Sequence, residues 1–249
     1  MTLGLPWVRS YDAGARLRLF CFPYAGGGTA DYRTWRPSFP GSIDICPVHL
    51  PAREARMSEK PITDLSTMVG SLADALNPLM GRTPFAFTGH SMGAWIAYEL
   101  ACELRRRRRP MPVHLFLSAR RPPDVPNPMP QLYHLPDGEF VQEIQRRFNA
   151  IPQQILDNPT FMKMFLPALR GDYALLETWH PEPEPPLDVP ITAFAGTSDT
   201  IVTRAMVHEW RRHTTAEFQL RQMPGGHFFL RDSADLLTDA IAGSLRRYL

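Results

Sequence analysis

The pentapeptide Gly89-His-Ser-Met-Gly93 matches G-x-S-x-G, and it lies between a short apolar stretch, Phe85–Phe87, and a helical pattern. A strand–turn–helix of this kind places the serine in a strained turn, where flanking glycines remove side chains that would collide. Ser91 Oγ is then exposed at the carboxyl end of a strand. The Met92 N–H lies at a helix N-terminus, where it can stabilise an oxyanion. A chance Gly/Ser loop is the alternative, and the flanking elements favour a nucleophilic serine.

Two distant residues are candidates to activate this serine. A serine is a poor nucleophile until a base removes its proton, and histidine suits that role. His227 follows a predicted strand and two glycines, whereas His90 adjoins Ser91 in a turn from which neighbouring side chains diverge. We expect Asp199, which ends the turn Gly196-Thr-Ser-Asp199, to orient His227 and to stabilise its imidazolium. Asp124, just past the preceding strand, is the alternative acid.

A glycine-rich loop, Pro23-Tyr-Ala-Gly-Gly-Gly28, follows the predicted strand 17–22. In serine hydrolases with this type of nucleophile turn, the loop after an early strand supplies the second oxyanion N–H. We predict Ala25 as this donor, with Gly26 as the second choice. A plain turn or a phosphate-binding loop is the alternative. The phosphate loop is disfavoured because neither G-x-G-x-x-G nor a G-K-[ST] ending is present.

The elements that must position these residues alternate in type along the chain. Apolar stretches predict strands at 17–22, 43–48, 85–87, 113–118, 191–195 and 216–223. Helical patterns cover 63–80, 92–108, 204–212 and 233–249. This alternation predicts an α/β fold with a mostly parallel central sheet flanked by helices. The length, 249 residues, suits one domain spanning 1–249.

Residues 122–182 interrupt this alternation. The segment begins and ends in proline-rich sequence, and it contains helical patterns at 137–148, 152–157 and 159–178. Long insertions of this kind usually serve as lids or binding loops, so we predict a helical lid. Its dense apolar residues have two readings, as lid packing or as the lining of an acyl-chain tunnel: Phe161, Met162, Met164, Phe165 and Leu166.

Composition excludes several functions. Apolar residues make up 44% and charged residues 21%, and the net charge is only +2, so neither nucleic acid nor an anionic membrane is implied. No apolar run approaches transmembrane length, and the N-terminus lacks a signal-peptide pattern. Three isolated cysteines predict buried core positions in a reducing cytoplasm. Metal-ligand spacing and a dinucleotide fingerprint are both missing, so we expect no metal and no cofactor.

Two groups of arginines have an ordinary reading and a functional one. Arg105–Arg109 ends a predicted helix, where cations complement the macrodipole, so a solvated face is favoured over a docking patch. Arg53 and Arg56 could meet a phosphate or an acidic partner. We predict that they are solvated loop charges.

Read together, the motifs resemble those of type II thioesterases, the free-standing editing enzymes of polyketide and non-ribosomal peptide assembly lines. The resemblance covers nearly the whole chain. G-H-S-M-G alone occurs in many hydrolases, but its combination with the first two motifs is much more specific. The matching segments are Phe22–Gly28 with Tyr32 and Trp35, Leu50–Arg56, Gly89–Gly93, Leu169–Tyr173, Gly196–Asp199 and Gly225–Phe229.

The resemblance implies an α/β-hydrolase fold with a helical lid, and hydrolysis of acyl groups from the phosphopantetheine arm of a carrier protein. It assigns the catalytic triad and the oxyanion-hole N–H groups to Ser91, Asp199, His227, Ala25 and Met92. Two departures stand out. Ala52 replaces the usual glycine of the arginine-bearing segment, and Gly171 replaces a common alanine of the lid motif, which predicts a looser lid helix.

This resemblance also implies carrier proteins as partners, without nucleic acid or membrane, and we expect a cytoplasmic monomer. Three other functions remain open. A general carboxylesterase or lipase would act equally well on oxygen esters. A cyclising product-release enzyme is disfavoured because the sequence shows no fused carrier region. A non-catalytic binding module is disfavoured by the intact Ser91, Asp199 and His227.

Overall fold

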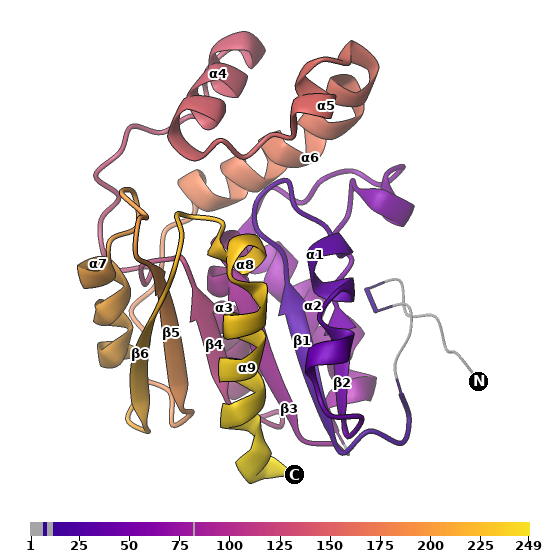
Figure 1. The fold of residues 1–249 in the computed structure, drawn as a ribbon, viewed down its shortest axis with the longest axis vertical. Helices are drawn as coiled ribbons and strands as arrows, with labels where there is room; N and C mark the ends of the chain where they lie inside the picture. Colours follow the sequence, from indigo (N-terminus) through magenta and orange to yellow (C-terminus); the bar gives the residue numbers. More distant parts are fainter. Residues whose placement is uncertain (1–6, 9–11, 82) are drawn as a thin grey trace.

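In the computed structural model, which describes residues 7–8, 12–81 and 83–249, six strands form one parallel sheet (Figure 1). The strand order is β2-β1-β3-β4-β5-β6. Their bounds are β1 Leu17–Phe22, β2 Ile43–Pro47, β3 Phe85–His90, β4 Leu115–Ser118, β5 Ile191–Gly196 and β6 Phe218–Met223. Because every pairing is parallel, the carboxyl ends of all these strands meet at one edge.

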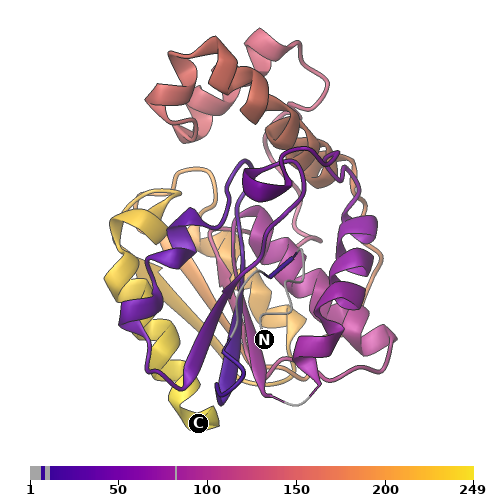
Figure 2. The ribbon, with the colours of Figure 1, turned by 90° about the vertical axis from the view of Figure 1, so that its right-hand side faces the viewer.

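Helices cover both faces of this sheet, which Figure 2 shows nearly edge-on. β1 is buried along its whole length, and its side chains alternate between two apolar cores. Phe20 and Phe22 belong to the core with α2 (Leu65–Met80), α3 (Met92–Arg106) and the region of α7 (Arg204–His208). Leu17, Leu19 and Cys21 pack on the other face with α9 (Ala234–Leu245). The three cysteines are free and buried, as predicted.

The predicted lid region forms three helices beyond the carboxyl ends of the strands (Figures 1 and 2). They are α4 (Asp137–Phe148), α5 (Gln153–Leu156) and α6 (Pro159–Thr178). Asn158 starts α6, because its side chain accepts hydrogen bonds from the N–H groups of Thr160 and Phe161. The helices share a small apolar core made by Leu132, Phe140, Ile144, Ile151 and Leu169.

Most element boundaries lie within three residues of the predictions, with two exceptions. The helix predicted at 204–212 is split into α7 (Arg204–His208) and the 3₁₀ helix η3 (Glu209–His213). The closing helix predicted at 233–249 is preceded by α8 (Phe229–Asp232) and ends in the 3₁₀ helix η4 (Arg246–Tyr248). Ser233 separates α8 from α9 because its backbone (φ −128°, ψ 36°) is not helical. The short helices α1 (Ala30–Arg33), η1 (Arg36–Ser38) and η2 (Glu54–Arg56) complete the described elements.

The arginines that end α3 are not a bare cationic face. Arg105 and Arg106 both pair with Glu184, and Arg107 pairs with Glu103 and Asp74. Three of the five charges are therefore neutralised by neighbouring carboxylates, which argues against an open docking patch. Across the described residues, no helix is long and apolar enough to span a membrane.

Candidate active site

Ser91 lies at the sharp turn between β3 and α3, with φ 52° and ψ −112°, a backbone conformation that L-residues rarely adopt. The two flanking glycines are sterically required. A Cβ on Gly89 would lie 2.0 Å from the Gly93 carbonyl oxygen, and a Cβ on Gly93 would lie 2.0 Å from the Phe22 carbonyl oxygen. The strained turn presents the serine at the carboxyl edge of the sheet, as the sequence predicted.

The structure brings the three predicted side chains into one hydrogen-bonded chain. His227 Nε2 is 3.1 Å from Ser91 Oγ, and His227 Nδ1 is 2.7 Å from Asp199 Oδ2. His227 follows β6, and Asp199 follows the neighbouring strand β5, so parallel pairing places both beside Ser91. In this arrangement Asp199 fixes the tautomer in which Nε2 faces the serine hydroxyl.

Asp199 is held as a carboxylate. Burial by itself would raise the pKa of Asp199, but the hydrogen bond from His227 and those from the backbone N–H groups of Val202 and Ile201 lower it below its usual value. The alternative acid does not reach the site. Asp124 instead accepts from His213 Nε2 at 2.9 Å and pairs with Arg212.

His90 has a supporting position that the sequence did not reveal. Its Nε2 is 2.7 Å from the backbone carbonyl oxygen of His227, which requires an Nε2–H donor on His90. Burial, with the neighbouring His227 as a lesser cause, lowers the pKa of His90 to about 3. His90 is therefore neutral at physiological pH, and it holds the backbone of His227 by this hydrogen bond.

The oxyanion donors can now be compared. Among the described residues, neither the Ala25 N–H nor the Met92 N–H has a protein acceptor, and both residues lie beside Ser91. The Gly26 N–H is already committed, because it donates to Asp172 Oδ2 at 2.7 Å. The geometry thus favours Ala25 over Gly26 as the partner of Met92.

The expectation that Arg53 is a solvated charge is wrong. Arg53 forms a two-pronged ion pair with Asp172 of α6, with both N···O distances at 2.7 Å, and its side chain is 9% exposed. Arg53 also donates to the Gly27 carbonyl oxygen. Arg56 is buried as well, paired with Glu59. Two segments far apart in the sequence, one after β2 and one in the lid, thus hold the glycine-rich loop 23–28, which contains Ala25.

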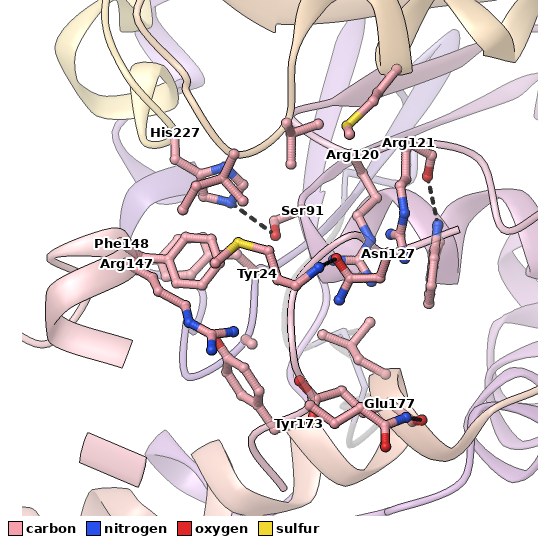
Figure 3. Close-up of a pocket in the computed structure, with 18 of the residues that line it drawn as sticks. Tyr24, Ser91, Arg120, Arg121, Asn127, Arg147, Phe148, Tyr173, Glu177 and His227 are labelled. Atoms are coloured by element: carbon pink, nitrogen blue, oxygen red, sulfur yellow. Dashed lines mark hydrogen bonds between the residues drawn. The ribbon is translucent and has the colours of Figure 1, made fainter. Parts of the chain in front are cut away.

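A cavity of about 350 Å³ opens onto Ser91 and His227, between the sheet edge and the lid (Figure 3). The lid forms part of the wall of this cavity, because the ring centroid of Phe148 in α4 lies 5.1 Å from that of His227. A second cavity of about 430 Å³ lies under α5 and α6 and shares Tyr24, Ala25 and Leu169 with the first. Within the described residues, no group of three His, Cys, Asp or Glu side chains is placed to hold a metal ion.

A parallel sheet with a serine at the turn after β3, a histidine after β6 and an acid after β5 defines an α/β-hydrolase with a serine-hydrolase site. A family model described as "Thioesterase domain" matches residues 17–247. This chain therefore belongs to the thioesterase domain family, as the resemblance predicted.

Individual relatives agree with this membership. The gramicidin S biosynthesis protein GrsT of Aneurinibacillus migulanus is 40% identical over 238 residues, covering 96% of this chain and 92% of its own. The RedJ thioesterase from the prodiginine pathway of Streptomyces coelicolor aligns with a TM-score of 0.86 and 38% identity, covering 94% of this chain and 87% of that one. The type II thioesterase BorB from the borrelidin cluster aligns with a TM-score of 0.83 and 32% identity, covering 96% of each.

Proposed function

We propose that this protein is a type II thioesterase, which removes aberrant or stalled acyl groups from the phosphopantetheine arm of carrier proteins in a polyketide or non-ribosomal peptide assembly line. The Ser91–His227–Asp199 chain carries this proposal, together with the relatives from such pathways. We further propose a cytoplasmic monomer that needs no cofactor. Support for this comes from the free cysteines and from the fact that one chain supplies every group of the site.

The reaction follows from the geometry. His227 Nε2 takes the proton of Ser91 Oγ, which attacks the thioester carbonyl carbon and forms a tetrahedral oxyanion. The N–H groups of Ala25 and Met92 stabilise this oxyanion. When the C–S bond breaks, the imidazolium of His227 gives its proton to the leaving thiolate. His227 then activates a water molecule, which hydrolyses the acyl-enzyme and regenerates Ser91.

The lid completes the site. We propose that residues 122–182 cover the acyl group, and that the hydrocarbon part of this acyl group occupies the apolar cavity under α5 and α6. Phe161 and Met164 support this, because they line that cavity although 51% and 46% of their surfaces are exposed. An apolar ligand there would remove this surface from water.

The test compares one acyl group in two forms, on a phosphopantetheinylated carrier protein and as a simple oxygen ester. Preferential release from the carrier is the expected result. Equal or faster cleavage of the oxygen ester would instead identify a general carboxylesterase. Ser91→Ala should abolish both reactions, which excludes a contaminating hydrolase as the source of either rate.

A further inference from the structure

Two adjacent arginines, Arg120 and Arg121, enter the cavity that contains Ser91. They follow β4, and in Figure 3 their side chains lie on the side of Ser91 opposite His227. Arg121 is only 7% exposed, and the Nε atoms of both arginines are buried without a hydrogen-bond partner in the described part of the chain. Two like charges are therefore held together beside the nucleophile.

These charges have no carboxylate partner among the described residues. The other cation of the cavity, Arg147, is satisfied by Glu143 and by the Pro130 carbonyl oxygen. The one acid lining the cavity is Glu177, and its Oε2 accepts from two backbone N–H groups at 2.7 and 2.8 Å. Burial, together with the like charge of Arg121, lowers the pKa of Arg120 to about 9, so Arg120 stays charged at neutral pH. The Glu177 carboxylate attracts the Arg120 charge, but the two side chains form no ion pair. Two like charges side by side in a partly buried cavity are costly, and a bound anion would offset that cost.

The pair is also held rigidly. Ala119, just before it, has a left-handed φ of 51°, which is unusual for a residue with a Cβ. The carbonyl oxygens of Arg120 and Arg121 each accept a 2.7 Å hydrogen bond from a tryptophan indole, Trp210 and Trp95 respectively. The Arg120 guanidinium lies 3.8 Å from the Trp95 ring centroid. Stacking of this kind leaves the N–H edge of a guanidinium available for planar recognition of an oxyanion.

We propose that Arg120 and Arg121 form an anion-binding subsite, which takes an oxyanion group of the substrate in the Ser91 cavity. The proposal rests on the proposed function and adds a specificity determinant to it. Two parts of a carrier-bound thioester can supply the anion, a carboxylate on the acyl group or the phosphate of the phosphopantetheine arm. The experiment below has separate arms for these sources.

The first arm uses inorganic phosphate as the probe and needs no turnover. The thermal midpoint is measured with and without phosphate at matched ionic strength, for wild type, Arg120→Met, Arg121→Met and Arg147→Met. A ligand that binds only the folded state raises this midpoint. We expect wild type and Arg147→Met to show the same phosphate-dependent rise, and the other two variants to lose it. Because each variant is compared with itself, a change in its basal stability does not affect the readout. An equal rise in all four proteins would overturn the subsite.

The second arm measures kcat/KM for butyryl and succinyl thioesters, each on pantetheine and on 4′-phosphopantetheine. We expect wild type to prefer one anionic form by about tenfold or more, the effect of a charge-assisted hydrogen bond. Arg120→Met and Arg121→Met should bring this ratio near one. A ratio that follows the carboxylate assigns the subsite to the acyl group, and one that follows the phosphate assigns it to the arm. No preference in wild type, or a preference that the variants retain, contradicts the proposal. If oxygen esters were cleaved as fast as carrier thioesters, the proposed function would fail. The phosphate-dependent rise in the thermal midpoint would still show whether Arg120 and Arg121 bind an anion.

Discussion

Asp172 on the lid helix α6 accepts the Gly26 N–H at 2.7 Å, next to the candidate oxyanion donor Ala25. The same carboxylate is held by both terminal nitrogens of Arg53, and Asp172 is 1% exposed. One buried carboxylate therefore joins the lid, the segment after β2 and the loop beside Ser91. The lid base and the oxyanion loop cannot move apart without exposing or unpairing this charge.

Asp172→Asn should lower both stability and turnover. In either orientation the amide places its NH₂ group against an N–H of the Arg53 guanidinium, and in one orientation also against the Gly26 N–H, and it leaves the buried cation without a counter-charge. Such a loss costs about 3–5 kcal/mol in free energy of unfolding. We expect kcat to fall more than KM rises, because the displaced loop carries Ala25, whose N–H we propose to act in the transition state. The matched control is Asp137→Asn, which removes an exposed lid ion pair with Arg170 and should cost less than about 1 kcal/mol. Equal effects of the two substitutions would contradict this role.

Ser91→Ala should lower kcat by about 10⁴- to 10⁶-fold, as loss of a catalytic nucleophile does. The thermal midpoint should stay close to that of wild type, since alanine keeps the Cβ at this turn. Ser198→Ala is the control, because Ser198 is exposed and adjoins Asp199 without facing the cavity. Single-turnover assays on a carrier-bound thioester measure the hydrolysis rates of Ser91→Ala and Ser198→Ala, and thermal unfolding gives their midpoints. Residual hydrolysis near the wild-type rate in Ser91→Ala would reject the acyl-enzyme route.

The Asp199 carboxylate should contribute to stability in a pH-dependent way. Its pKa is lowered in the folded protein, so the contribution is present above the unfolded-state pKa, about 3.9. It is lost as pH falls through the folded-state value. The difference in free energy of unfolding between wild type and Asp199→Asn should therefore be constant at higher pH and shrink below about pH 4. Denaturant titrations across this range give the measurement, and a difference that grows on acidification is the opposite of what we expect.

Gly171 was expected to loosen the lid helix, but its role is close packing. A Cβ at this position would lie 2.5 Å from Pro61 Cβ, so α6 approaches the body here more closely than an alanine allows. Gly171→Ala should cost about 1–3 kcal/mol through overpacking. Gly138→Ala, in lid helix α4, meets nothing within 4 Å and should gain up to about 1 kcal/mol from helix propensity. Thermal midpoints shifting in opposite directions would bear out this contrast, and a stabilised Gly171→Ala would refute it.

Ala52, which replaces the usual glycine of the arginine-bearing segment, has a strained backbone. Its φ is 65°, a left-handed conformation that costs an L-residue about 1–2 kcal/mol relative to glycine. Ala52→Gly removes that strain, but the glycine gives the unfolded chain more conformational entropy, which lowers the free energy of unfolding by about 0.4–1 kcal/mol. We expect a net stabilisation of about 0.5–1 kcal/mol in denaturant titrations. A clear loss of stability would mean that the Ala52 methyl contributes packing that outweighs the strain.

Much of the fold and site was predictable from short-range patterns. Strand β1 is largely apolar, with Arg18 as its one charged residue, because helices cover both of its faces. This composition predicts a buried parallel strand. Ser91 was recognisable because its turn requires glycine at fixed positions on either side. Helix α6 was predicted from its helical pattern at 159–178, and the structure shows the local reason for its start, a capping Asn158 followed by a proline at the first position.

Other features depend on residues far apart in the chain. The sequence could not pair Arg53 with Asp172, 119 positions away, so it favoured solvated charges where the structure has a buried ion pair. It likewise missed the hydrogen bond between His90 and the His227 backbone. It also missed the buried Nε atoms of Arg120 and Arg121, which have no hydrogen-bond partner in the part of the chain that the structure describes. Local sequence patterns do not show which distant residues become neighbours when the chain folds.

By itself, the sequence determined the α/β alternation and the strained serine turn, because both depend on glycine positions and apolar spacing within a few neighbouring residues. It predicted Ser91, Asp199 and His227 as site residues, with Asp124 left as an alternative acid. Only the tertiary structure decided which N–H groups remain free for an oxyanion, which charges are paired and where the lid contacts His227. Those outcomes depend on hydrogen bonding and desolvation between segments that meet only when parallel strands align their carboxyl ends.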